Sequence, residues 1–128
     1  MDDNSRRILI VDDAGLVRRF HRDALEKAGF TVVEALNGIE ALEKLLAEPF
    51  DMAVVDVNMP QMDGFTFVES VRGQALPLSS TPVLITSTES GPQDFAAARS
   101  AGANFYLTKP VAAEQLAEYA RILCGARA

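Results

Sequence analysis

The sequence predicts an α/β fold in which one doubly wound, five-stranded parallel sheet is covered by helices on both faces. Five short apolar segments alternate with longer segments whose apolar residues recur every three or four positions. This alternation is typical of parallel strands joined by helical crossovers. Right-handed crossovers allow the strand order 2-1-3-4-5 in a three-layer sandwich, with a crevice where the carboxyl ends of the first and third strands meet.

The predicted strands differ in how continuous their apolar character is. Residues 8–11, 52–55 and 83–85 are unbroken apolar runs, as expected of strands buried on both faces, so the first, third and fourth strands should be central. The second strand contains Glu34 and should lie at an edge. The five strands are predicted at residues 7–11, 31–35, 52–55, 82–86 and 104–107.

The predicted helices follow from apolar residues at helical spacing. Gly29 and Gly102 stand where left-handed cap residues belong, after the first and fourth helices, and Asn37 and Asp63 stand at N-cap positions. The apolar faces, taken in chain order, consist of Val17, Phe20, Ala24 and Ala28; Ala41, Leu42, Leu45 and Leu46; Phe67, Val68 and Val71; Phe95, Ala98 and Ala101; and Leu116, Ala120 and Leu123.

Length and composition indicate one globular domain. The chain has 128 residues, of which 48% are hydrophobic and 23% charged, and we expect a core over about residues 6–123 with short polar tails. It contains neither an apolar run near the roughly 20 residues of a membrane span nor a signal-peptide core, which predicts a cytoplasmic protein. A net charge of -6 argues against nucleic-acid binding. The single cysteine, Cys124, is expected to be structural.

Three acidic residues follow two of the predicted central strands. Asp12 and Asp13 come after the first strand and Asp56 after the third, so their carboxylates should face one another. Two such charges about 4 Å apart repel by about 4 kcal/mol at an effective dielectric constant near 20, which calls for a cation. Oxygen ligands without histidine or cysteine favour Mg²⁺. For the Asp12–Asp13 pair alone, helix capping is the favoured interpretation, and it is the third acid, Asp56, that favours a metal site.

Hydroxyl groups and a lysine are predicted at the same rim of the sheet. Thr86, Ser87 and Thr88 follow or end the fourth strand, and Lys109 follows the fifth. Each feature alone is usually an ordinary turn or a solvated side chain. Together with a carboxylate nucleophile and a metal, they are the groups that phosphoryl transfer requires. No glycine-rich phosphate loop follows the first strand, so nucleotide binding has no support.

The order of these motifs resembles the response-regulator receiver domains, over nearly the whole chain from Arg6 to about Leu123. The spacing is similar to that of the single-domain, CheY-like chemotaxis regulators, which have the flavodoxin-like fold that the strand order predicts. The resemblance therefore implies a stand-alone response regulator of a two-component system. The matching segments are LIVDD at 9–13, VVDVNMPQMDG at 54–64, PVLITS at 82–87 and YLTKP at 106–110.

The resemblance implies a role for each rim residue. Asp56 would accept a phosphoryl group from the phosphohistidine of a sensor histidine kinase, and Lys109 would pair with a phosphoryl oxygen. Mg²⁺ would be held by Asp13, Asp56 and the backbone carbonyl of Asn58, with Asp12 acting through water. The same resemblance implies a cis peptide bond between Lys109 and Pro110.

The resemblance also implies a switch. Ser87 would close toward the phosphoryl group and Tyr106 would turn inward, which would reshape the face made by the fourth helix, fifth strand and fifth helix for a downstream protein. A simpler interpretation of Tyr106 is an aromatic cover over the sheet. Asn58 and Glu89 occupy positions that tune hydrolysis in the family, and we expect a phosphorylated state lasting seconds to minutes. Thr88 is bulkier than the usual residue and could narrow access to Asp56.

Three other residues are interpreted as structural, and two other functions compete with the switch. His21 is expected to be a solvated helical residue, and Met59 and Met62 to be packing residues. An aspartyl-phosphate phosphatase also uses a carboxylate after a strand, but Asn58 stands where its acid/base aspartate would be. A degenerate receiver that binds partners without phosphorylation is the third hypothesis, which the intact set of acids, hydroxyl and lysine disfavours.

Overall fold

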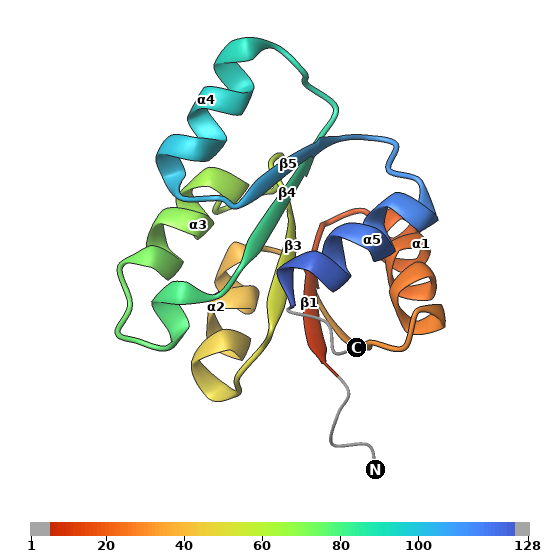
Figure 1. The fold of residues 1–128 in the computed structure, drawn as a ribbon. Helices are drawn as coiled ribbons and strands as arrows, with labels where there is room; N and C mark the ends of the chain where they lie inside the picture. Colours follow the sequence, from red (N-terminus) through yellow and green to blue (C-terminus); the bar gives the residue numbers. More distant parts are fainter. Residues whose placement is uncertain (1–5, 125–128) are drawn as a thin grey trace.

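Five parallel strands form one sheet in the order β2-β1-β3-β4-β5 within residues 6–124, the part of the chain that the computed structural model describes (Figure 1). The predicted topology is therefore confirmed, with β2 and β5 at the edges. The predicted polar tails lie outside the described residues. The strands are β1 Arg7–Val11, β2 Thr31–Ala35, β3 Met52–Asp56, β4 Val83–Ser87 and β5 Phe105–Thr108.

Three strands end one residue later than predicted. Asp56 pairs with Thr86 in the ladder between β3 and β4, and Ser87 pairs with Thr108 between β4 and β5. The ladder continues through these polar residues because it is made by backbone groups, whatever the side chain. Asp56 and Ser87 are consequently the last residues of strands, which holds them more rigidly than loop positions would.

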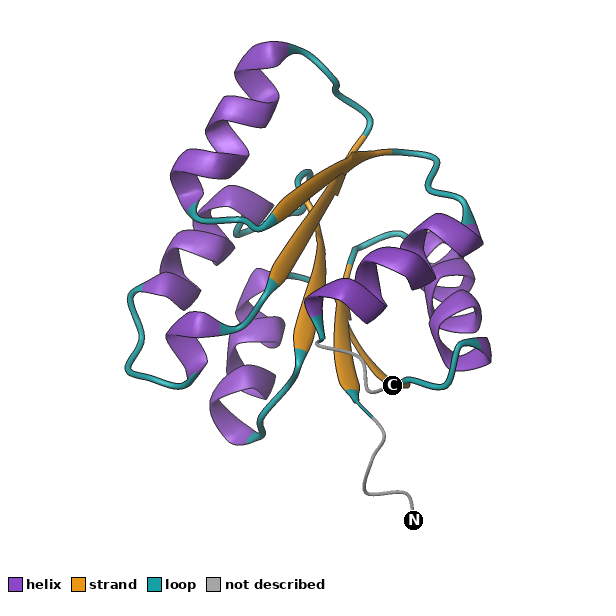
Figure 2. Cartoon of the chain, in the orientation of Figure 1, coloured by secondary structure: helices purple, strands orange, loops and turns teal. Residues whose placement is uncertain are grey.

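Helices cover both faces of the sheet (Figures 1 and 2). α1 and α5 lie on one face, and α2, α3 and α4 lie on the other. None of the helices in residues 6–124 is long and apolar enough to span a bilayer. The helices are α1 Gly15–Lys27, α2 Gly38–Ala47, α3 Gly64–Arg72, α4 Pro92–Ala101 and α5 Ala113–Leu123, with a short 3₁₀ turn η1 at Leu78–Ser80.

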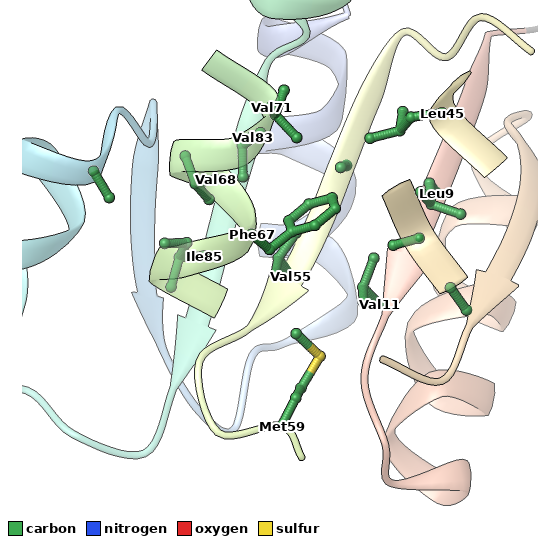
Figure 3. Close-up of a cluster of buried hydrophobic side chains, with 14 of the residues drawn as sticks. Leu9, Val11, Leu45, Val55, Met59, Phe67, Val68, Val71, Val83 and Ile85 are labelled. Carbon is green, nitrogen blue, oxygen red and sulfur yellow. The ribbon is translucent and has the colours of Figure 1, made fainter. Parts of the chain in front are cut away.

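The core is divided by the sheet into two clusters. Alternate residues of the central strands point to opposite faces, as strand geometry requires. On the face covered by α2, α3 and α4, Val55 and Ile85 pack around Phe67 of α3 (Figure 3). On the other face, Val54 and Leu84 pack against residues of α1 and α5. Both faces of the central strands are therefore buried, as their unbroken apolar runs predicted.

The predicted faces of α1, α2 and α4 are each partly wrong, and in α4 it is Phe95 that is exposed. In α1 the buried residues are His21 and Leu25, whereas Phe20 is half exposed. His21 and Leu25 also have helical spacing, but a periodicity that treats histidine as polar does not find this stripe. The expectation of a solvated His21 is wrong, since only 3% of the residue is exposed. In α2, Leu46 is exposed because it lies beside the buried stripe and not on it.

The predicted helix caps are confirmed. The side chain of Asn37 accepts a hydrogen bond from the Glu40 backbone N–H, and that of Asp63 accepts one from Thr66. Gly29 and Gly102 have φ values of 101° and 107°, a region that favours glycine. These caps fix where the helices begin and end relative to the strands.

Candidate functional site

Five predicted side chains lie together at the carboxyl ends of four strands. We call this rim of the sheet the acidic edge. Asp12 and Asp13 follow β1, and Asp56 ends β3. Because Val11 pairs with Val55 in the parallel ladder, the next residues, Asp12 and Asp56, emerge side by side. Ser87 ends β4 and Lys109 follows β5, so a hydroxyl and a cation lie at the same edge.

Lys109 connects two of the acids directly. Its Nζ lies 2.9 Å from Oδ2 of Asp12 and 2.9 Å from Oδ1 of Asp56. The two carboxylates are buried, with 2% and 7% of their side chains exposed, so solvent screens these ion pairs weakly. Oδ1 of Asp12 also accepts a hydrogen bond from the Ala14 backbone N–H. The lysine thus ties the end of β5 to the ends of β1 and β3.

The acidic cluster carries more negative charge than Lys109 neutralises. Asp12, Asp13 and Asp56 each offer a carboxylate oxygen, and the three oxygens lie within 4.8 Å of one another. Three carboxylates against one ammonium group give a formal net charge of about -2. Asp13 is exposed, so the cluster opens to solvent on one side. An all-oxygen, solvent-accessible set of this charge fits Mg²⁺, which binds through carboxylates and keeps several waters.

Burial and charge change the pKa values of the two central groups. Burial raises the pKa of Asp56, the hydrogen bond from Lys109 acts in the opposite direction, and the charges of Asp12 and Asp13 raise it further. Burial alone would lower the pKa of Lys109, but its hydrogen bonds to Asp56 and Asp12 outweigh that effect and raise it. Lys109 therefore stays protonated at neutral pH.

The hydroxyl run at the end of β4 is divided between core and surface. Ser87 is 1% exposed, and its Oγ accepts a hydrogen bond of 3.0 Å from the Glu89 backbone N–H, so its proton remains available for donation. Thr86 is fully buried, and its hydroxyl has no hydrogen-bond partner among residues 6–124. Thr88 and Glu89 are exposed beside the site, as is Asn58 in the loop after β3.

Tyr106 links β5 to the loop that precedes α4. Its hydroxyl donates a hydrogen bond of 2.7 Å to the backbone carbonyl of Glu89. Its ring packs edge-on against Phe95 of α4, with ring centroids 4.7 Å apart. The residue is partly buried, and its hydroxyl connects β5 to the segment that follows Ser87.

The loop that follows Asp56 depends on residues that the sequence analysis did not single out for the site. Gly64 donates its N–H to the carbonyl of Val57, and a Cβ on Gly64 would lie 2.5 Å from the backbone oxygen of Asp56. Met59 is buried and Met62 packs on the same cluster, as predicted. The Lys109–Pro110 bond is cis, which confirms that expectation. The PQMDG segment at 60–64 carried the signal for Gly64.

His21 is a buried residue close enough to the site for the charges of Asp12 and Lys109 to shift its pKa. Burial lowers the pKa of His21, while the charge of Asp12 raises it and that of Lys109 lowers it. Its Nδ1 has no hydrogen-bond partner in the described part of the chain. The signal that could have found it is its spacing of four from Leu25, which places both on the buried side of α1.

Comparisons of the sequence and of the structure with known proteins both match receiver domains. The profile of the response regulator receiver domain family matches residues 8–121. The chain is 34% identical over 121 residues to the chemotaxis protein CheY1 of Helicobacter pylori, covering 93% of this chain and 97% of that protein. It is 33% identical over 110 residues to the protein PilG of Pseudomonas aeruginosa, covering 86% and 81%.

Solved structures are similar over almost the whole chain. The chemotaxis protein CheY4 of Vibrio cholerae matches with a TM-score of 0.87 and 36% identity, covering 93% of this chain and 98% of that one. The receiver domain of the Francisella response regulator 1452 matches with a TM-score of 0.88 and 28% identity, covering 94% and 98%. The layered fold therefore has close counterparts among solved structures.

Proposed function

Because the chain belongs to the response regulator receiver domain family, we propose that it is a phosphorylation switch in which Asp56 accepts a phosphoryl group from the phosphohistidine of a sensor histidine kinase. The observation that carries this proposal is the buried Asp56 carboxylate, held by Lys109 within a cluster of three acids. A carboxylate of this kind is a suitable nucleophile once its repulsion with the neighbouring acids is compensated.

The cofactor in this proposal is Mg²⁺. Asp13, Asp56 and the backbone carbonyl of Asn58 would hold it, with Asp12 acting through water. Bound there, the ion would neutralise charge on the carboxylates and on the oxygens of the incoming phosphoryl group. The excess of carboxylates over Lys109 in the described structure supports this assignment.

The proposed reaction moves the phosphoryl group between two protein side chains. An oxygen of Asp56 forms a bond to phosphorus while the phosphorus–nitrogen bond of the phosphohistidine breaks. The electron pair stays on the histidine nitrogen, which takes a proton from solvent. Lys109, already placed against Asp56, donates a hydrogen bond to one phosphoryl oxygen, and the Ser87 hydroxyl donates a hydrogen bond to another. The result is an acyl phosphate on Asp56.

The output of the proposed switch is a change in partner binding. When Ser87 turns toward the phosphoryl group, its bond with the Glu89 N–H is lost. The loop that Tyr106 holds through the Glu89 carbonyl then changes, and Tyr106 turns inward. The face formed by α4, β5 and α5 would take a new shape that a downstream protein binds. The chemotaxis proteins among its relatives support a chemotaxis-like role, and the proposed switch acts in the cytoplasm.

The proposed phosphorylated state is short-lived. Asn58, Thr88 and Glu89 are exposed around the site and would control how water reaches the acyl phosphate. We expect a lifetime of seconds to minutes for the purified protein with Mg²⁺. A half-life of many hours would contradict this assignment of the three residues.

The test uses the purified chain, a small phosphodonor such as acetyl phosphate, and intact-mass measurement. We expect a gain of one phosphoryl group with Mg²⁺ and none with a chelator. Asp56→Asn should gain none, whereas Asp51→Asn, an acid distant from the edge, should behave like the original chain. Sustained turnover of unrelated phosphate esters would instead favour a phosphatase. No gain under any condition would favour a degenerate receiver.

A further inference from the structure

Arg72, the last residue of α3, joins several segments at the end of the sheet opposite to the acidic cluster. Its guanidinium group donates four hydrogen bonds, and every acceptor is an uncharged oxygen. Such a planar group with several donors can hold acceptors from different segments at once. The acceptors are the backbone carbonyls of Gly102, Ser79 and Thr81 and the Oδ1 of Asn104, at 2.9, 2.9, 2.7 and 2.9 Å.

Two of these acceptors fix the start of β5 and the end of α4. Oδ1 of Asn104 also accepts a bond of 2.8 Å from the Val83 N–H, and the Asn104 N–H donates one of 2.8 Å to the Val83 carbonyl, so the starts of β4 and β5 are tied together. Gly102 is the left-handed cap of α4, and a Cβ there would lie 2.8 Å from Cγ of Arg72. The cation thus meets the end of α4, where the helix dipole is negative.

The two ends of α4 are held in different ways. Its buried residues, Ala98 and Ala101, lie in its second half, and Phe95 in its first half is 38% exposed. The segment before α4 is held by two bonds to Glu89, one involving the Ser87 hydroxyl and the other the Tyr106 hydroxyl. Both bonds involve residues that change partners in the proposed switch. The bonds of Arg72 involve neither.

We propose that Arg72 is the fixed pivot of α4. When Ser87 and Tyr106 change partners, residues 88–95 move while residues 98–104 stay in place against α3. This inference rests on the proposed phosphorylation of Asp56. Its physical basis is a difference in free-energy cost. Moving Arg72 away would leave several carbonyl oxygens without a donor, whereas Ser87 and Tyr106 each give up a single hydrogen bond.

The experiment is hydrogen–deuterium exchange with mass spectrometry on the whole chain, with Mg²⁺ and with or without acetyl phosphate. Phosphorylated protein should change its exchange in peptides covering 88–95 and keep that of 98–104. In unphosphorylated Arg72→Gln, exchange over 98–104 should rise by about tenfold or more, because local opening no longer has to break the hydrogen bonds that Arg72 donates. Arg72→Lys should behave in the same way, because an ammonium group cannot replace the planar fork.

Arg99→Gln is the matched control, since Arg99 is an exposed cation on α4 itself, and it should match the original chain. If exchange in Arg72→Gln also rises over β1 and β3, this variant has lost its fold. The proposal is then tested by Arg72→Lys and by the comparison of phosphorylated with unphosphorylated original chain. Equal changes over 88–95 and 98–104 in phosphorylated protein, or unchanged exchange over 98–104 in the Arg72 variants, would overturn the pivot. Intact mass on the same samples shows separately whether phosphorylation has failed. In that case, exchange over 98–104 in the unphosphorylated original chain and Arg72 variants tests whether Arg72 holds this segment.

Discussion

The excess of negative charge at the acidic edge lowers the free energy of unfolding, and a substitution at one residue can measure by how much. Asp12, Asp13 and Asp56 repel one another within 4.8 Å, and Lys109 compensates only part of that repulsion. The protein keeps a locally unfavourable arrangement, which is common where a site must bind a cation and a reactant. Asp13 is the exposed member, so its charge can be removed without leaving a buried group unpaired.

Asp13→Asn should therefore raise the free energy of unfolding by about 1 kcal/mol in a chelator, after discounting the repulsion for solvent screening. Adding Mg²⁺ should stabilise the original chain more than the variant, because the ion binds only the folded site. Urea unfolding with and without Mg²⁺ measures both effects. Asp23→Asn, an exposed acid on α1, is the control. Equal stabilisation of Asp13→Asn and the original chain by Mg²⁺ would contradict the assignment of Asp13 as a ligand.

His21 gives the fold a dependence on pH. Burial lowers its pKa below the ordinary 6.5, so as the pH falls the unfolded chain takes up this proton before the folded chain does. Stability contributed by neutral His21 is therefore present above pH 6.5 and is lost as the pH falls from there toward the lowered folded-state pKa.

Urea unfolding at pH 7.5 and 5.5 should show a larger loss for the original chain than for His21→Leu or His21→Gln, neither of which titrates. At the higher pH, His21→Leu should also be more stable by about 1 kcal/mol, because the unpartnered Nδ1 is removed. The same pH dependence in all three proteins would show that His21 does not titrate in this way.

At the scale of elements, the junction of β3 and α3 sets the position of Asp56. Gly64 begins α3 directly against the backbone of Asp56, where a side chain has no room. Gly73, which follows the other end of α3, has its nearest neighbour 3.6 Å from a built Cβ and a φ of -84°. The two ends of one helix therefore offer a matched pair of substitutions.

Gly64→Ala should lower the free energy of unfolding by about 2 kcal/mol or more, because the backbone that carries Asp56 must shift. It should also slow phosphorylation by the small donor. Gly73→Ala should change neither by a measurable amount. Denaturation midpoints and the rate of mass gain test both statements, and a Gly64→Ala chain with unchanged stability would contradict the close approach.

The sequence predicted the elements well and their ends less well. Unbroken apolar runs identified β1, β3 and β4 as central, because strands buried on both faces need apolar residues at every position. The ends of β3, β4 and β5 were displaced by one residue, since backbone pairing continues through Asp56 and Ser87. Apolar periodicity missed the buried side of α1, where His21 occupies a core position.

At the scale of the whole molecule, Phe67 is the largest fully buried side chain in the described structure, at the centre of the cluster shown in Figure 3. Phe67→Ala should lower the free energy of unfolding by about 3 to 5 kcal/mol, a large part of the 5 to 15 kcal/mol typical of a domain. Phe95→Ala should cost clearly less, because Phe95 is 38% exposed. Urea unfolding compares the two, and equal losses would contradict the assigned core.

The candidate site was largely predictable because a parallel sheet places all strand carboxyl ends at one edge. Asp12, Asp13, Asp56, Ser87 and Lys109 could be placed there from their positions after strands alone. The bonds of Lys109 to both Asp12 and Asp56, and the link from Tyr106 to Glu89, could not. They depend on where long side chains end, and that is decided by tertiary packing and not by spacing in the sequence.

The most direct test of the central claim locates the phosphoryl group. After reaction with acetyl phosphate and Mg²⁺, borohydride reduction converts an aspartyl phosphate to homoserine, which peptide mass spectrometry places at one residue. The account predicts homoserine at residue 56, and none when the Mg²⁺ is chelated. Homoserine at Asp12 or Asp13 instead, or a stable phosphoester on a serine or threonine, would contradict Asp56 as the phosphoacceptor.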